Sequence, residues 1–324
     1  MILFYILLLL IGFIALIRGA DTFVDGSSAL ARAFKVPGLI IGLTIVALGT
    51  SAPELAVSTS AAIQGSNEIA LSNVIGSNIF NLLCVLGMCA IIHPVPVDKG
   101  IIKRDFPISI IATVFLLITT GSAALSAGIS LQSMDEIVGN VSRGIAAILF
   151  IAFIVYIVYL IVDARKNPSV EEQVELKPIY QCIILLILGL VMIVVGGQAV
   201  VYSAKEVARF FGMSETLIGL TIVAVGTSLP ELVTSVVAAR KGETGLAVGN
   251  VIGSNIFNLM FILGVSALIN PIGVNVASIL DLIILIAVSV VSFVFAMTSK
   301  EISRKEGIAM ILIYIVDVIF AAIR

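Results

Sequence analysis

A short polar stretch, Gly49-Thr50-Ser51-Ala52-Pro53-Glu54, interrupts an apolar run that extends from Leu39 to Ile63. A charge at the centre of a membrane-length helix costs about 2.5–3.5 kcal/mol. Proline removes a backbone donor and disrupts the preceding turn. Such a break is tolerated at that depth where the freed carbonyl groups line a polar cavity. The carboxylate, the two hydroxyls and the loosened carbonyls therefore predict an oxygen-rich pocket, the kind of site that holds hard cations.

The composition places this pocket in a lipid bilayer. Of the 324 residues, 60% are hydrophobic and 12% are charged, and the mean hydropathy is +1.22. A soluble domain has too little interior to bury that much apolar surface, and the apolar runs lack the period-two alternation of a transmembrane barrel. The net charge of −2 gives no indication of nucleic-acid binding. The predicted class is an all-α polytopic membrane protein.

The apolar runs and the Gly, Pro and Asn punctuation between them predict ten transmembrane helices. The first is expected to be interrupted near Gly19, and segment 121–140 is expected to be an exposed loop. The predicted helices span approximately 2–33, 38–63, 68–92, 104–125, 142–163, 179–211, 216–239, 244–269, 277–298 and 306–323.

Basic residues are distributed unevenly between the two sets of alternating loops. One set carries 13 Lys and Arg residues and the other carries 4. Because cytoplasmic loops are enriched in Lys and Arg, the richer set is predicted to be cytoplasmic. We therefore expect a multi-pass protein of the cell membrane, with both termini outside and the 164–178 linker in the cytoplasm.

The chain contains an internal repeat. Segment 42–87 aligns without a gap on segment 219–264, 177 residues later, with 29 of 46 positions identical. Each half is predicted to be a five-helix unit, 1–163 and 179–324. Because five is odd, the second unit enters the membrane from the opposite side, and inverted repeats place ion sites near the midplane between them. Glu54 and Glu231 are then expected to meet.

A second polar stretch follows in each repeat, from Asn73 to Asn81 and from Asn250 to Asn258. In lipid these side chains must face protein or water. Four of them are interpreted as members of the ion site: Ser77, Asn81, Ser254 and Asn258. For the other four, hydrogen bonding between helices is the favoured interpretation, and ion coordination stays open: Asn73, Asn78, Asn250 and Asn255.

The repeated motifs resemble those of the calcium/cation antiporter superfamily, specifically its sodium/calcium exchanger type. Its G-T-S-x-P-E motif stands at 49–54 and 226–231, and its G-N-x-x-G-S-N motif stands at 249–255 and, with Ser72 in place of the first glycine, at 72–78. The resemblance implies ten helices in two inverted halves, with helices 1 and 6 sliding across a core of the other eight. The linker 164–178 has only 15 residues and is too short to be a regulatory domain, and no resident cofactor is expected.

The resemblance also implies a set of ion ligands. Calcium is expected at Glu54, Glu231 and the carbonyl groups of Thr50 and Thr227, with Asn81 and Asn258 beside the centre. Sodium is expected on one side at Ala47, Thr50, Ser51 and Ser77, and on the other at Ala224, Thr227, Ser228 and Ser254. Asn258 stands where many members carry aspartate, which counts against potassium dependence.

Three classes of function are compatible with these features. The leading hypothesis is an antiporter that exchanges Na⁺ for Ca²⁺, works as a monomer and has protons as competitors. A proton/calcium antiporter of the same superfamily is the first alternative, and a passive cation channel is the second. An enzyme is the weakest, because the sequence shows no nucleophile–base pair and the only histidine, His93, lies at a predicted helix end.

Overall fold

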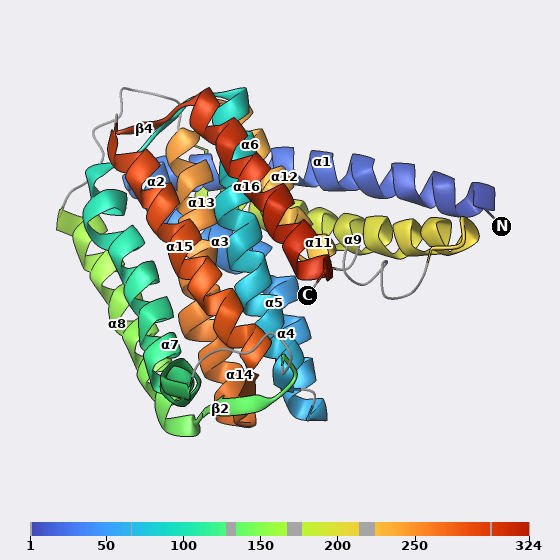
Figure 1. Ribbon diagram of the computed structural model, residues 1–324. Helices are drawn as coiled ribbons and strands as arrows, with labels where there is room; N and C mark the ends of the chain where they lie inside the picture. Colours follow the sequence, from blue (N-terminus) through green and yellow to red (C-terminus); the bar gives the residue numbers. More distant parts are fainter. Residues whose placement is uncertain are drawn as a thin grey trace.

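The computed structural model describes residues 2–65, 67–127, 134–166, 177–213, 224–298 and 300–323. These residues form long helices with four very short strands between them (Figure 1). The π-helical segments η1, η2, η3 and η5 continue directly into α-helices, so each such group forms one helical rod.

The first half of the chain contains the following elements: α1 (Ile2–Phe34), α2 (Gly38–Ile41), η1 (Gly42–Val46), α3 (Ala47–Thr50), α4 (Ala52–Gln64), α5 (Asn67–Phe80), η2 (Asn81–Val85), α6 (Leu86–Ile92), β1 (Val95–Pro96), η3 (Ile101–Asp105), α7 (Phe106–Ala127), β2 (Ile137–Val141) and α8 (Arg143–Lys166). The second half contains α9 (Ile179–Phe210), α11 (Ala224–Gly226), α12 (Leu229–Arg240), α13 (Thr244–Ile256), η5 (Phe257–Ile262), α14 (Leu263–Ile269), β3 (Ile272–Asn275), α15 (Val276–Thr298), β4 (Glu301–Ile302) and α16 (Arg304–Ile323).

The helices are long and apolar enough for a membrane protein. Among the described residues, seven helices could cross a bilayer, or eight if the bent pair Gly38–Thr50 and Ala52–Gln64 forms one span. Large apolar side chains are exposed along the outer helices, as a lipid environment requires. The polytopic helical class predicted from the sequence is therefore confirmed.

Each repeated motif breaks its helix at the serine. Ser51 has φ −82° and ψ 10°, and α4 leaves the preceding helix at an angle of 49°. Ser228 has φ −93° and ψ 7° before α12. Pro53 and Pro230 then occupy the first turn of the new helix, where a missing N–H leaves no intrahelical bond unmade. The predicted break is present in both copies.

Two local predictions were wrong. Helix α1 runs through Gly19 without interruption, because that glycine serves a close helix contact rather than a break. Segment 121–140 is not simply an exposed loop, since α7 continues to Ala127 and β2 begins at Ile137. The predicted start of the seventh helix, at 216, lies outside the described residues.

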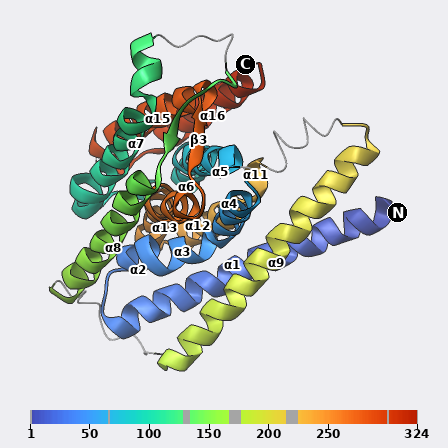
Figure 2. The same cartoon turned by 90° about the horizontal axis from the view of Figure 1, so that it is seen from below.

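Helices α1 and α9 lie against each other along much of their length and cross one side of the bundle, extending beyond it (Figures 1 and 2). Glycines allow their backbones to approach closely. A Cβ atom at Gly19 would lie 2.8 Å from the backbone nitrogen of Ile193, and one at Gly189 would lie 2.5 Å from that of Phe23. The two helices that were expected to slide over the core are therefore packed tightly on each other.

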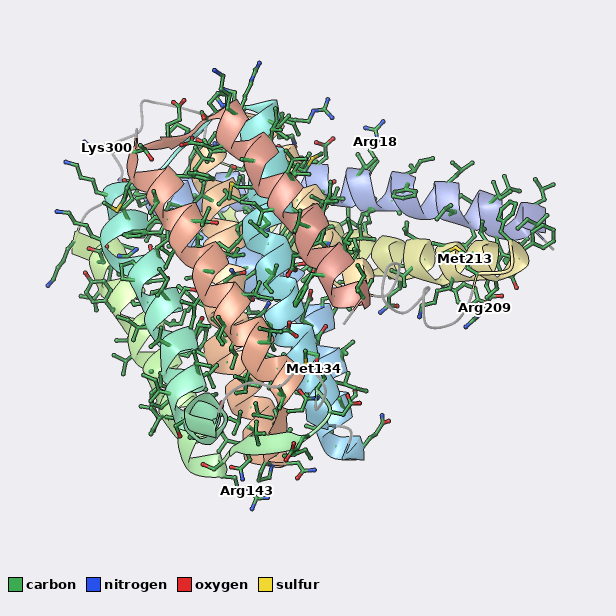
Figure 3. All side chains as sticks on the ribbon, in the orientation of Figure 1. Arg18, Met134, Arg143, Arg209, Met213 and Lys300 are labelled. Carbon is green, nitrogen blue, oxygen red and sulfur yellow. The ribbon has the colours of Figure 1, made fainter. Side chains whose placement is uncertain are left out.

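Short strands join the two halves of the chain at the ends of the bundle. β1 pairs antiparallel with β4, and β2 pairs antiparallel with β3. In Figure 1, β4 lies at the upper end and β2 at the lower end. In Figure 3, Lys300 lies at the upper end of the bundle and Arg143 lies at the lower end.

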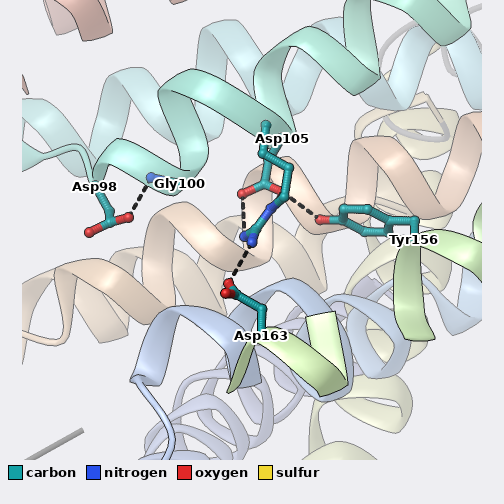
Figure 4. Close-up of polar contacts among 6 residues, drawn as sticks. Asp98, Gly100, Asp105, Tyr156 and Asp163 are labelled. Carbon is teal, nitrogen blue, oxygen red and sulfur yellow. Dashed lines mark hydrogen bonds and ion pairs between the residues drawn. The ribbon is translucent and has the colours of Figure 1, made fainter. Parts of the chain in front are cut away.

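An ionic network fixes η3, which leads into α7, to the C-terminal part of α8 (Figure 4). Arg104 donates two hydrogen bonds to the fully buried Asp105, at 2.6 and 3.0 Å, and a third to Asp163 at 2.9 Å. The Tyr156 hydroxyl donates to Asp105 at 3.0 Å. Asp105 is thereby compensated in charge and in hydrogen bonding, as a buried carboxylate must be.

Candidate cation site

The two intramembrane glutamates lie in the first turns of α4 and α12, and the side chains of both are fully buried. Their position is favourable for a negative charge, since the N-terminal end of a helix carries a partial positive charge. No basic residue forms an ion pair with either glutamate within the described chain. The predicted acidic pair is therefore present without a basic partner.

Each glutamate receives a hydrogen bond from the serine of the other motif. The Ser51 hydroxyl donates to Oε1 of Glu231 at 2.8 Å, and the Ser228 hydroxyl donates to Oε1 of Glu54 at 2.9 Å. These two bonds are related by the 177-residue offset. They place the helix break of each half against the carboxylate of the other half, so the two motifs build one site.

Four asparagines form a second set of contacts, between α5–η2 and α13–η5. Asn78 and Asn255 each donate to the other's backbone carbonyl at 3.2 Å. Their side-chain oxygens accept from the amides of Asn258 at 3.0 Å and Asn81 at 3.1 Å. Because the nitrogens of Asn81 and Asn258 are used in this way, their side-chain oxygens remain available for other ligands.

Eleven buried side-chain oxygens have no hydrogen-bond partner among the described residues, and seven of them are hydroxyls. The other four accept hydrogen bonds only and all belong to this site: Glu54 Oε2, Glu231 Oε2, Asn81 Oδ1 and Asn258 Oδ1. Buried polar atoms are rarely left unpaired, and each such atom calls for an explanation. Carboxylate and amide oxygens are the ligands that Ca²⁺ and other hard cations take in proteins. These four oxygens, two of which belong to carboxylates, therefore suit such a cation as ligands.

The two sides of this site differ. Ser77 contacts Oε1 of Glu54 at 3.4 Å and the Ser228 hydroxyl at 3.0 Å, whereas the hydroxyl of Ser254, its repeat counterpart, is buried without a partner. Thr50 is fully buried and donates to Oδ1 of Asn250 at 3.0 Å, whereas Thr227 is only half-buried. The Thr50 side is closed by protein hydrogen bonds, and the Thr227 side is less covered.

The remaining predicted site residues lie beside this centre. Ala47 is buried at the start of α3, and Ala224 begins α11, although its side chain is outside the described part of the chain. Asn73 and Asn250 are hydrogen-bonded between helices, as the favoured interpretation predicted. Sequence reasoning missed their partners Ser58 and Ser235, although the same serine stands at both positions of the repeat.

The first glycine of each motif faces the α1–α9 pair. A Cβ atom at Gly49 would lie 3.1 Å from the ring of Phe23, and one at Gly226 would lie 2.5 Å from the side chain of Val201. The α1–α9 pair therefore passes directly over both helix breaks. A movement of the α1–α9 pair would therefore act on the broken helices that carry Glu54 and Glu231.

Comparison with known proteins agrees with this geometry. The family model described as sodium/calcium exchanger protein matches residues 4–162 and 182–323. The putative antiporter CaxA of Alkalimonas amylolytica is 37% identical over 314 residues, which cover 94% of this chain and 95% of that protein. The sodium/calcium exchanger MaX1 of Methanosarcina acetivorans is 32% identical, covering 95% of this chain and 96% of that protein.

A solved structure extends the similarity to the fold. The sodium-calcium exchanger NCX_Mj, soaked with 10 mM Na⁺ and zero Ca²⁺, matches with a TM-score of 0.82 and 33% sequence identity, covering 100% of both chains. Broken helices, a buried acidic pair and this match define a polytopic membrane antiporter of the cation/calcium class, a transporter rather than an enzyme. The chain belongs to the sodium/calcium exchanger protein family.

Proposed function

We propose that the protein exchanges Na⁺ for Ca²⁺ by alternating access at a single site near the membrane midplane. The observation that carries this proposal is the crossed pair of serine–glutamate bonds around four unpaired oxygens of total charge −2. Two inverted five-helix halves, 1–163 and 179–324, would build this site, joined by the linker 164–178. The reciprocal contacts at the 177-residue offset support the inverted relation.

The ion ligands that we propose are those that the family resemblance implies. Ca²⁺ would be held by the carboxylates of Glu54 and Glu231 and by the carbonyl groups of Thr50 and Thr227, beside the amide oxygens of Asn81 and Asn258. Na⁺ would bind on either side of this centre, where hydroxyls and backbone carbonyls complete its shell. One sodium set comprises Ala47, Thr50, Ser51 and Ser77, and the other comprises Ala224, Thr227, Ser228 and Ser254.

The charge of the site explains exchange rather than leak. A low-dielectric pocket strongly disfavours two uncompensated carboxylates. One Ca²⁺ neutralises them, and so do two Na⁺ or two protons. The loaded carrier can then change its access, whereas the bare carrier with charge −2 does so rarely. The competing ions therefore move in opposite directions through the same site.

The packing of the α1–α9 pair supports a rigid moving unit. Backbone contacts at Gly19 and Gly189 hold the two helices together, so the pair would slide over the remaining helices as one body. In the state described, the Thr50 side is closed and the Thr227 side is more exposed. If the basic-rich loops are cytoplasmic, the Thr227 side faces outside, and the protein is in an outward-facing state.

Calcium uptake into proteoliposomes tests this function. Vesicles preloaded with Na⁺ should accumulate external Ca²⁺, whereas vesicles preloaded with K⁺ at the same ionic strength should not. Uptake that ignores the Na⁺ gradient but follows an imposed pH gradient would assign the protein to proton/calcium exchange instead. A Ca²⁺ current without counter-ion dependence, and far faster than a conformational cycle, would indicate a channel.

A further inference from the structure

Three buried side chains, linked by hydrogen bonds, hold the hydroxyl of Thr50 in place. The Asn250 amide donates to the Ser235 hydroxyl at 2.9 Å, and its Oδ1 accepts from the Thr50 hydroxyl at 3.0 Å. Thr50, Ser235 and Asn250 are all fully buried. Because Ser235 accepts the amide hydrogen, the oxygen of Asn250 is turned towards Thr50.

The other half of the protein contains the same three residue types, but one of the two hydrogen bonds between them is missing. The Asn73 amide donates to the Ser58 hydroxyl at 3.0 Å, which gives it the orientation seen in Asn250. Thr227 is the counterpart of Thr50, but in the described structure it makes no hydrogen bond to Asn73, and both side chains are only half-buried. The threonine–asparagine bond is therefore formed in the Thr50 half and absent in the Thr227 half, where the Asn73 amide already has the matching orientation.

The Thr50–Asn250 bond lies at the end of a tightly packed interface between η1–α3 and α13. A Cβ atom at Gly42 would lie 3.0 Å from Cα of Gly249, and one at Gly253 would lie 2.7 Å from Cα of Leu43. These contacts press the helix that ends at Thr50 onto α13. The Thr50–Asn250 bond lies at the last residue before the break at Ser51, where it fastens the end of that helix.

We propose that Asn250 with Ser235, and Asn73 with Ser58, are two alternating latches that each hold one side of the ion site closed. This inference rests on the proposed alternating-access function and assigns these four side chains as positioning residues, not ion ligands. In the state described, Thr50 is latched to Asn250. When access changes, that bond opens and Thr227 bonds to Asn73, which Ser58 has kept in the required orientation.

The proposal predicts the direction in which two matched substitutions shift the population of the two access states. Ser235→Ala weakens only the latch that closes the Thr50 side, so it shifts the population towards the state open on that side. Ser58→Ala removes the same hydroxyl from the other half and shifts the population the opposite way. The serine–asparagine bond is present in both states, so its loss acts through the orientation of the asparagine. Where the threonine–asparagine bond of the closed side is lost as a result, the population ratio changes by about five-fold.

Apparent affinity reports this population, because the apparent Kd on one face is the intrinsic Kd divided by the fraction of carriers open to that face. Right-side-out and inverted membrane vesicles from the same cells present opposite faces to the bath. The measurement is therefore KM for bath Ca²⁺ in both vesicle types, expressed as the ratio of the Thr227-side KM to the Thr50-side KM.

The ratio should rise about five-fold in Ser235→Ala and fall about five-fold in Ser58→Ala. Ser235→Cys, which retains the side-chain volume, should shift the ratio in the same direction as Ser235→Ala if the alanine variant folds poorly. Ratios that stay unchanged, or that move in the same direction in both halves, would overturn the proposal, since a merely structural role alters both faces alike. Absence of Na⁺-dependent Ca²⁺ uptake in the parent would instead refute the proposed function.

Discussion

Replacing Glu54 by glutamine tests the central charge of the site. Oε1 of Glu54 accepts hydrogen bonds from Ser228 and Ser77, whereas Oε2 is unpaired. A glutamine would keep its carbonyl oxygen at the two hydroxyls and turn its NH₂ group into the place of Oε2. The substitution therefore removes one negative charge and also directs two donor hydrogens at the cation.

An upper limit can be set on the loss of Ca²⁺ binding free energy. A pair of unit charges at about 4 Å interacts by about 4 kcal/mol at an effective dielectric of about 20, so a divalent ion loses up to about 8 kcal/mol. Removing a buried carboxylate also removes its desolvation penalty of several kcal/mol. A net loss of about 3–4 kcal/mol corresponds to a Ca²⁺ affinity that is about two to three orders of magnitude weaker.

Isothermal titration of the purified protein with Ca²⁺ measures this change directly. Glu206→Gln is the matched control, because Glu206 lies on α9, pairs with Arg209 and forms no hydrogen bond or ion pair with a site residue within the described part of the chain. The control should bind Ca²⁺ like the parent, and Glu54→Gln should retain the helical circular dichroism of the parent. A folded Glu54→Gln protein with an affinity within about three-fold of the parent, roughly 0.6 kcal/mol, would refute the reasoning.

Three other substitutions probe the scaffold. Gly189→Ala should lower Tm by several degrees, because the added carbon would lie 2.5 Å from a backbone nitrogen of α1 and overpacking costs about 1–3 kcal/mol. Arg104→Leu should destabilise the protein by about 3–5 kcal/mol, since it leaves Asp105 buried without its cation. Lys241→Met should change turnover by less than about five-fold, because the ion pairs of Lys241 with Asp21 and Asp25 are partly exposed and such pairs contribute about 1 kcal/mol or less.

Each of these has a control or a second measurement. Gly144→Ala, where a Cβ meets only ordinary contacts, should leave Tm unchanged. Adding Asp105→Asn to Arg104→Leu should recover part of the lost stability, and transport per folded molecule should remain, because this network lies away from the glutamates. A fall in Ca²⁺ affinity in the Arg104 variant would contradict that separation.

The Lys241 contact also has a defined pH dependence. Burial lowers the pKa of its ammonium group, but hydrogen bonds and charge from Asp25 and Asp21 outweigh burial and raise it above its ordinary value. A raised lysine pKa means that the contact is fully present below about pH 10 and is lost only as the pH rises through the raised value. Lys241→Met and the parent should therefore show parallel flux profiles between about pH 6 and 9, and profiles that diverge there would disprove this assignment.

Much of the site could be predicted from the chain alone because the repeat is explicit. Proline next to an intramembrane carboxylate predicted the breaks before Glu54 and Glu231, and the odd number of helices in each repeat predicted that the two residues meet. The crossed bonds were not predictable, since the offset does not specify which serine faces which carboxylate. That geometry depends on how far the two broken helices interpenetrate, which side-chain packing decides.

The contact between α1 and α9 shows a different limit. Glycines recur every seven residues at 12, 19 and 26 and again at 189 and 196, which predicts a close helix contact. The pattern does not name the partner helix. The structure shows that they bind the two helices to each other. The strands β2 and β3 were missed because segments of five and four residues are too short for an alternating pattern to stand out from the apolar helices around them.

The crossed serine bonds have a consequence for biosynthesis. Glu54 enters the bilayer about 170 residues before the ribosome has made Ser228, the donor that later binds it. A half-made chain therefore carries this carboxylate in lipid without its closer hydroxyl donor and with the longer 3.4 Å contact to Ser77. A charge at that depth costs about 2.5–3.5 kcal/mol on insertion scales. Glu231, in contrast, arrives when Ser51 is already in the membrane. The nascent protein thus remains incomplete at its centre until the second half has been inserted.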